Sequence, residues 1–201
     1  ALHTTGSNNP DGIEIKKNKD KNGIPVDGIP FHPYYTVKDI VGVGVFLTLF
    51  AIVVFFVPTL GGLFLEPPNF EPANALSTPL HIAPVWYFTA FYAILRAVPD
   101  QQFGALLMAL AVVAFFFMPW LDRAKNNSMR YRGMVSKAHL GMFFITFIVL
   151  SYLGLQPAEG IYVLLARIFT ALYFAYFLLL PFISKADGDG PVPERVTYHA
   201  H

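Results

Sequence analysis

The sequence predicts an all-α integral membrane protein with four transmembrane helices and a short re-entrant or interfacial helix in the first periplasmic loop. Two observations lead to this prediction. Of the 201 residues, 55% are hydrophobic, 16% are aromatic and only 13% are charged, which is far more apolar than a soluble domain needs. The apolar residues also gather into long runs that carry few charges, and each of the four longest runs can cross a bilayer as a helix.

The four predicted spans follow one another along the chain. They are residues 40–57, 103–121, 138–155 and 161–183. The apolar run at residues 82–95 has only 14 residues, which is too short to span. Pro84 favours an extended conformation at the residue before it, so we expect the chain to turn there. A short amphipathic helix should follow and present Trp86, Tyr87 and Tyr92 as one wall of a pocket.

The distribution of positive charge predicts the orientation, because Lys and Arg are enriched in cytoplasmic loops. With both termini in the cytoplasm, only Arg96 and Arg167 lie on the periplasmic side. The other twelve of the 14 basic residues are cytoplasmic: Lys16, Lys17, Lys19, Lys21, Lys38, Arg123, Lys125, Arg130, Arg132, Lys137, Lys185 and Arg195. This predicts a cytoplasmic segment at residues 1–37, a membrane domain at 38–183 with a periplasmic loop at 58–99, and a cytoplasmic tail at 184–201.

The absence of Cys rules out a disulfide framework, a Cys-ligated zinc site and an iron–sulfur cluster held by this chain. The six His are scattered, and no metal site is expected. The first ten residues contain neither a starting Met nor the basic and apolar regions of a signal peptide. We therefore expect the chain to begin within a longer protein.

Several separated motifs carry a resemblance to a known family. Thr78-Pro79, His81-Ile82 and Pro84-x-Trp86-Tyr87 resemble the Pro-Glu-Trp-Tyr loop of cytochrome b, the quinone-reacting subunit of the cytochrome bc complex (ubiquinol:cytochrome c oxidoreductase). Val85 stands where the family usually has Glu, as in some proteobacterial members. Further matches follow in the family's order at residues 2–3, 6–10, 30–35, 38–39, 69–70, 72–74, 94–96, 128–129 and 156–157.

The resemblance implies that this chain corresponds to helices E to H, the C-terminal half of cytochrome b. Four helices favour the respiratory type, because the equivalent subunit of the related photosynthetic complex has three. The family holds its two b haems with His pairs on helices B and D, which would precede Ala1. The only His in a predicted span is His139, at the start of the third. The haem ligands are therefore expected on the N-terminal half, either in a partner chain or in a missing part of this one.

The resemblance also implies two quinone sites and their residues. Ubiquinol would be oxidised on the periplasmic side, and ubiquinone would be reduced on the cytoplasmic side, where Phe31 would pack the ring and Asp39 and His3 would deliver protons. The quinol-oxidising residues are Pro84, Val85, Trp86, Tyr87, Phe88 and Tyr92. The quinone-reducing residues are His3, Ser7, Phe31, Lys38 and Asp39.

Val85 leaves the proton acceptor for quinol oxidation open. His81 is the nearest titratable residue on the loop, but Pro84 lies between them and can turn His81 towards solvent. The alternatives are a water chain to a haem propionate, or Tyr87 or Tyr92 relaying to water. The implied partners are the N-terminal half of cytochrome b, a Rieske iron–sulfur protein and a c-type cytochrome subunit, in a dimeric complex of a bacterial inner membrane; no nucleic acid is expected.

Other interpretations remain open at this stage. Phe31 can belong to an interfacial aromatic belt, and Asp39 can simply complement a helix dipole. The chain as a whole can be a non-redox four-helix scaffold or a transporter module. A transporter would be expected to carry polar or charged groups near the bilayer midplane and paired broken helices, and neither is visible in the sequence.

Overall fold

The computed structural model describes residues 9–13, 15–65, 70–77, 82–188 and 190–194. The chain forms two compact units, one made of residues 1–13 and 82–201 and the other of residues 14–81. We describe each unit by itself. Three predicted site residues, His3, Ser7 and His81, lie outside the described residues.

Four helices of the described residues are long and apolar enough to cross a membrane, as the sequence predicts. Helix α2 is Tyr34–Phe56, the second span is Gln101–Leu121, α6 is Met134–Gly154 and α7 is Gly160–Ala186. The remaining described residues form short helices, turns and a single isolated β-bridge between Lys19 and Pro25, with no strand. The prediction of an all-α membrane fold is confirmed.

The second span is interrupted, whereas the sequence predicts one continuous helix. It consists of α4 (Gln101–Ala114), the 3₁₀ turn η4 (Phe115–Phe117) and α5 (Met118–Leu121). Pro119 explains the change, because proline has no N–H to donate to the carbonyl four residues earlier, which is that of Phe115. The backbone therefore adopts the tighter 3₁₀ pattern, with hydrogen bonds between residues three apart, over Phe115–Phe117 before the α-helix resumes.

Two helices begin four or more residues before their predicted spans, because charged residues lie within their first two turns. Helix α2 starts at Tyr34, so Lys38 and Asp39 are helical residues. Helix α6 starts at Met134, and the ammonium group of Lys137 in its first turn donates to the carbonyl of Arg130 at 3.2 Å. A long Lys side chain can lie along an apolar helix and keep its charge at the end, so counting uncharged residues places the helix start too late.

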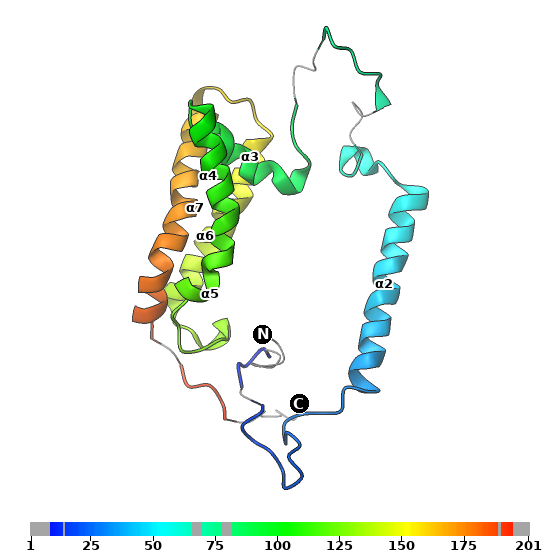
Figure 1. The fold of residues 1–201 in the computed structure, drawn as a ribbon, viewed down its shortest axis with the longest axis vertical. Coiled ribbons are helices and arrows are strands. Elements are labelled where there is room, and N and C mark those ends of the chain that lie inside the picture. The colour runs from blue at the N-terminus through cyan, green and yellow to red at the C-terminus, as the bar shows by residue number, and fades with distance from the viewer. Residues whose placement is uncertain (1–8, 14, 66–69, 78–81, 189, 195–201) are drawn as a thin grey trace. The chain divides into compact units, whose positions relative to one another are not determined.

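The core of the larger unit is a cluster of aromatic side chains between α4, α6 and α7, which run side by side in Figure 1. Tyr173 is completely buried and donates its hydroxyl hydrogen to the carbonyl of Ala111 at 2.8 Å. Phe115, in the turn η4, packs edge-on against Phe143 and Phe177. The interrupted span is thus held to α6 and α7 at the point where its backbone changes.

The two ends of this unit differ in character. The short helix α3 (Thr89–Arg96) packs against the start of α4 and the end of α6 (Figure 1). The connection between α5 and α6 lies at the other end and carries the basic residues Arg123, Lys125, Arg130 and Arg132, and Lys137 follows in the first turn of α6. The 21 residues of α6 separate the two ends by about 30 Å, which is the thickness of a bilayer's hydrocarbon core.

Segments from both ends of the sequence pack on the α5–α6 connection. The Ser128 hydroxyl donates to the carbonyl of Pro10, and Arg130 forms an ion pair with Asp11. On the C-terminal side, the N–H of Gly190 donates to the carbonyl of Tyr131 at 2.7 Å. The basic end of the unit is therefore closed by chain segments that are far apart in sequence.

Candidate functional site

The segment that follows Pro84 forms the predicted short helix. Val85 is extended, with φ −55° and ψ 143°, and precedes the 3₁₀ turn η3 (Trp86–Phe88), which continues into α3. The Thr89 hydroxyl donates to the carbonyl of Trp86 at 2.6 Å and joins the two elements. The sequence therefore predicts correctly that a helix begins just after this proline.

Three adjacent aromatic rings project from η3. Trp86, Tyr87 and Phe88 are each a little over half exposed, at 54%, 53% and 54%. The ring of Tyr87 lies 5.5 Å from that of Trp86, edge to face, and 5.0 Å from that of Phe88. We call these three residues the aromatic surface. Its rings contact one another but remain open on their outer side, which suits a flat apolar ligand.

The opposite side of α3 is buried against α6. Thr89, Ala90, Ala93 and Ile94 are buried, and Gly154 allows the closest approach. A Cβ atom at Gly154 would clash with the carbonyl of Thr89, so the backbones of α3 and α6 touch at this point. Since a helix is fixed by its buried face, this contact sets the position of the aromatic surface.

Two arginines hold the C-terminal end of α3. The Nη2 atom of Arg96 donates to the carbonyls of Leu153, Gly154 and Gln156 at 3.3, 3.2 and 2.8 Å. These groups lie at the end of α6, where the last carbonyls lack helical partners. The guanidinium carbon of Arg96 also lies 4.4 Å from the ring centre of Tyr92. Arg167 of α7 donates from Nε to the carbonyl of Ala97 at 2.8 Å.

Three of the predicted quinone-reducing residues, Phe31, Lys38 and Asp39, belong to the smaller unit. The rings of Phe31 and Tyr35 stack with their centres 6.0 Å apart, and the ammonium group of Lys38 lies 5.5 Å from the ring centre of Tyr35. The structure thus brings Phe31 and Lys38 together around Tyr35. Asp39 is exposed on the same first turns of α2. His3 and Ser7, the remaining residues of this predicted site, are not among the described residues.

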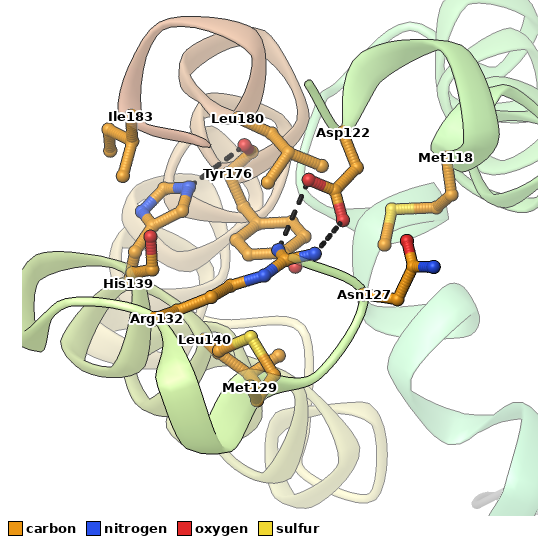
Figure 2. A pocket seen from close by; sticks show the side chains of 11 residues that line it. Met118, Asp122, Asn127, Met129, Arg132, His139, Leu140, Tyr176, Leu180 and Ile183 are labelled. Atoms are coloured by element: carbon orange, nitrogen blue, oxygen red, sulfur yellow. Dashed lines mark hydrogen bonds and ion pairs between the residues drawn. The ribbon is translucent and has the colours of Figure 1, made fainter. Parts of the chain in front are cut away.

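A cavity of about 190 Å³ opens between α5, α6 and α7 at the basic end of the larger unit (Figure 2). On one side, Arg132 donates from Nη1 and Nη2 to the two carboxylate oxygens of Asp122, at 3.1 and 2.8 Å. On the other, His139 stacks on the ring of Tyr176, with the ring centres 4.6 Å apart. Met118, Asn127, Met129, Ser136, Leu140, Leu180 and Ile183 complete the lining.

This cavity is not predicted by the sequence. Its polar residues come from the α5–α6 connection and two helices, so no local spacing links Asp122 and Arg132 to Tyr176. The Nε2 atom of His139 lies 3.1 Å from the carbonyl oxygen of Tyr176, to which it donates. The charged pair Asp122–Arg132 and the imidazole of His139 thus already have partners within the lining.

The described residues do not suit a b haem, which needs two axial His ligands. Only His32 and His139 are described, and they belong to different units. His139 is buried and its Nε2 is bonded to Tyr176. Among the described residues there is also no group of three His, Cys, Asp or Glu that could hold a metal ion.

The comparison with known families decides what the chain is. The family described as cytochrome b (C-terminal)/b6/petD matches residues 72–174, which is just over half of the 201 residues. This chain belongs to that cytochrome b family. The match includes the aromatic surface, α3, both arginines at its end and most of the core of the bundle.

Individual cytochromes b extend the similarity over nearly the whole chain. The chain is 59% identical to cytochrome b of Allochromatium vinosum over 205 residues, covering 98% of this chain and 50% of that protein. It is 47% identical to cytochrome b of Rickettsia bellii over 197 residues, covering 98% of this chain and 46% of that one. The chain therefore spans about half the length of the curated cytochromes b that it matches.

A solved structure supports the same fold. A chain of a hyperthermophilic respiratory Complex III matches with a TM-score of 0.77 and 36% sequence identity, covering 92% of this chain and 45% of that chain. Similarity at this level extends beyond the shared fold to the sequence, so the cytochrome b chain described here and that Complex III chain are true relatives.

Proposed function

We propose that this chain is the C-terminal half of the quinone-reacting subunit of a respiratory ubiquinol:cytochrome c oxidoreductase. The observation that carries the proposal is the aromatic surface, because Trp86, Tyr87 and Phe88 stand open on a helix that is fixed to the bundle by Arg96 and Gly154. Membership of the cytochrome b family and the similarity to a respiratory Complex III chain support it.

The outer site oxidises ubiquinol to ubiquinone, and each quinol loses two electrons and two protons. The aromatic surface, with Pro84, Val85 and Tyr92, binds the quinol ring and keeps water away from it. Val85 has no group that accepts a proton. The protons therefore leave by another route, which is ordered water, the hydroxyl of Tyr87 or Tyr92, or His81.

The inner site reduces ubiquinone, which takes up two electrons and two protons. Phe31 packs against the quinone ring, while Lys38 is held by Tyr35 at the start of α2. Asp39 is exposed there and exchanges protons with water. His3 and Ser7 complete this site, His3 as a proton donor because an imidazole titrates near neutral pH.

The partners of this chain supply the redox groups. The N-terminal half of cytochrome b holds two b haems, which carry electrons across the membrane when bound. A Rieske iron–sulfur protein and a c-type cytochrome subunit accept electrons on the outer side, and the complex is a dimer. This division is supported by the described residues of this chain, among which no pair of His suits a haem.

We place the chain in a bacterial inner membrane with both termini in the cytoplasm. The four basic residues of the α5–α6 connection, and Lys137 at the start of α6, lie at the opposite end of the bundle from α3, and this separation supports the orientation. Labelling of single Cys residues at positions 18 and 126 in intact cells tests it. Both should be protected from an impermeant reagent, and labelling of one but not the other would reject this topology.

A non-redox transporter fits the described residues less well. The charged residues of the four described spans lie near the helix ends: Lys38, Asp39, Lys137, Arg167 and Lys185. A transporter would be expected to place such groups near the middle of the membrane, where substrates and ions bind. The described spans therefore favour quinone chemistry at the two membrane faces.

Mutation of the aromatic surface tests the proposed function in the assembled complex. Trp86→Leu should raise the KM for ubiquinol or lower kcat, because it removes one ring of the binding wall. Phe116→Leu is the matched control, since Phe116 is 73% exposed but lies on η4 away from α3. Normal quinol oxidation in Trp86→Leu, with full assembly and haem content, would refute the proposal.

A further inference from the structure

We propose that Arg96 is a positioning residue that holds the ring of Tyr92 in the wall of the quinol-oxidising pocket. This inference rests on the proposed function. Arg96 and Tyr92 occupy successive turns of α3, four residues apart, so their side chains lie on the same face of the helix. The Arg96 guanidinium makes two kinds of contact at once, and together these fix its plane.

The first kind of contact anchors the guanidinium to the bundle. Its Nη2 atom donates to three carbonyls at the end of α6, those of Leu153, Gly154 and Gln156. The shortest of these hydrogen bonds is 2.8 Å long. A hydrogen bond from a charged donor is stronger than a neutral one, so the position of Arg96 is set by α6.

The second kind of contact is with the ring of Tyr92. The guanidinium carbon lies 4.4 Å from the ring centre, well inside the distance at which a cation is attracted to an aromatic face. The Nε atom of Arg96 is buried and has no hydrogen-bond partner among the described residues. A buried donor without a partner is costly, and the contact of the guanidinium with the aromatic face offsets part of that cost.

A residue that only capped α6 would not need this geometry. A lysine would satisfy the carbonyls at the end of α6 with a compact charge and three donors, but it has no planar group to lie against a ring. The guanidinium joins the end of α6 to Tyr92, which is only partly buried. Without the planar guanidinium against it, the Tyr92 ring can rotate more freely in the wall where the quinol would bind.

The consequence concerns quinol binding more than the chemistry. A freely turning ring must be ordered again each time quinol binds, which weakens binding without changing the groups that accept protons. A cation–π contact of this kind corresponds to roughly a two- to thirtyfold change in an equilibrium constant. The KM for ubiquinol should therefore change more than kcat.

A double-mutant cycle in the assembled complex tests the inference. Arg96→Lys should raise the KM for ubiquinol, at most by about the thirtyfold of a whole cation–π contact, because the planar group is lost. It should leave kcat within about twofold, because the charge and the donors to α6 remain. In a Tyr92→Leu background, the same change at Arg96 should have little further effect on KM, since the ring has gone. Tyr92→Phe, which keeps the ring, should retain the sensitivity to Arg96→Lys.

Arg167→Lys is the matched control. Arg167 also fixes the end of α3, through the carbonyl of Ala97, but it has no described contact with Tyr92. Its effect on KM should be small and should be the same in the Tyr92→Leu background. If Arg96→Lys fails to assemble, Arg96→Gln replaces it in the cycle, because the amide still donates to α6 but carries no charge.

The outcomes separate this inference from the proposed function. Equal effects of Arg96→Lys with and without the Tyr92 ring would overturn the inference, since Arg96 would then act only on α6. An unchanged KM in both backgrounds would also overturn it. If the proposed function is wrong, Trp86→Leu and Tyr92→Leu will themselves leave the kinetics of quinol oxidation unchanged in a complex with normal haem content.

Discussion

The Asp187 carboxylate accepts a hydrogen bond of 2.8 Å from the backbone N–H of Ser136, and this contact ties the end of α7 to the first turn of α6. The Ser136 hydroxyl bonds to the same carboxylate. Gly133 lies so close that a Cβ atom there would clash with Asp187. The first N–H groups of a helix have no helical acceptor, so Asp187 acts as a cap supplied by another helix.

These contacts predict how the stability of the complex depends on Asp187. The hydrogen bonds from Ser136 hold the pKa of the Asp187 carboxyl below its ordinary value of 3.8. The stabilisation is thus complete above about pH 3.8 and is lost as the pH falls through the lower pKa of the folded state. Asp187→Asn should lower the Tm of the solubilised complex at neutral pH, and the difference should shrink below pH 3.8.

Glu71→Gln is the control for this experiment, because Glu71 is an exposed carboxylate in the other unit. The Tm of the complex carrying Glu71→Gln should match that of the unmodified complex at every pH. A Tm difference for Asp187→Asn that stays constant from neutral to acid pH would mean that the charge of Asp187 does not stabilise α6.

Gly154→Ala should separate α3 from α6. The added methyl group would meet the carbonyl of Thr89, and overpacking of this kind typically costs about 1–3 kcal/mol. Gly141→Ala is the control in the same helix, because its Cβ would meet nothing within 4 Å. That change should be neutral or stabilise the helix by roughly 0.5–1 kcal/mol. The Tm and the rate of quinol oxidation should both fall in Gly154→Ala, and neither should fall in Gly141→Ala.

Val85 should tolerate a carboxylate. Val85→Glu is expected to support quinol oxidation and to change its pH dependence, because it adds a proton acceptor to the loop, whereas Val85→Ala should change little. Steady-state quinol oxidation from acid to alkaline pH measures both effects. A large loss in Val85→Ala would show that this side chain shapes the pocket.

His81→Gln tests the alternative proton route in the same assay. We expect only a small effect, since water or a tyrosine can carry the proton. If His81 were the essential base, its loss would cost about 10²- to 10⁴-fold in rate. A loss of that size, with normal haem content, would show that His81, and not water, is the proton acceptor.

Asp39→Asn and His3→Ala should slow quinone reduction at the inner site. Removing a positioned proton donor typically costs about 10²- to 10⁴-fold, whereas the first turnover of quinol oxidation should be unaffected. Flash-induced kinetics of haem reoxidation in the complete complex separate the two sites. Normal reoxidation in both variants would assign these residues a structural role only.

The sequence predicts the helices well because they depend on local composition, and it predicts their ends less well. Long apolar runs identify all four spans, but Lys137 lies inside α6 and Pro119 divides the second span. The helix after Pro84 is also predicted, since proline restricts the residue before it.

The contacts that fix the site could not be predicted in this way. Arg96 meets carbonyls that come about 60 residues later, and Asp122 and Tyr176 share a cavity from different elements. Such contacts depend on the packing of helices, which no local pattern encodes. The roles of Trp86, Tyr87 and Asp39 rest on resemblance to the family, and they remain predictions to be tested in the complex.

The anchoring of Arg96 has a consequence for biogenesis. The carbonyl of Gln156 that receives its shortest hydrogen bond is made 60 residues after Arg96. At about 5–20 residues per second, translation reaches it on the order of 3–12 s later. During that interval α3 and the aromatic surface have no α6 to pack against. A nascent chain halted before α6 should therefore expose residues 82–96 to protease, and protection should arise only as α6 is inserted.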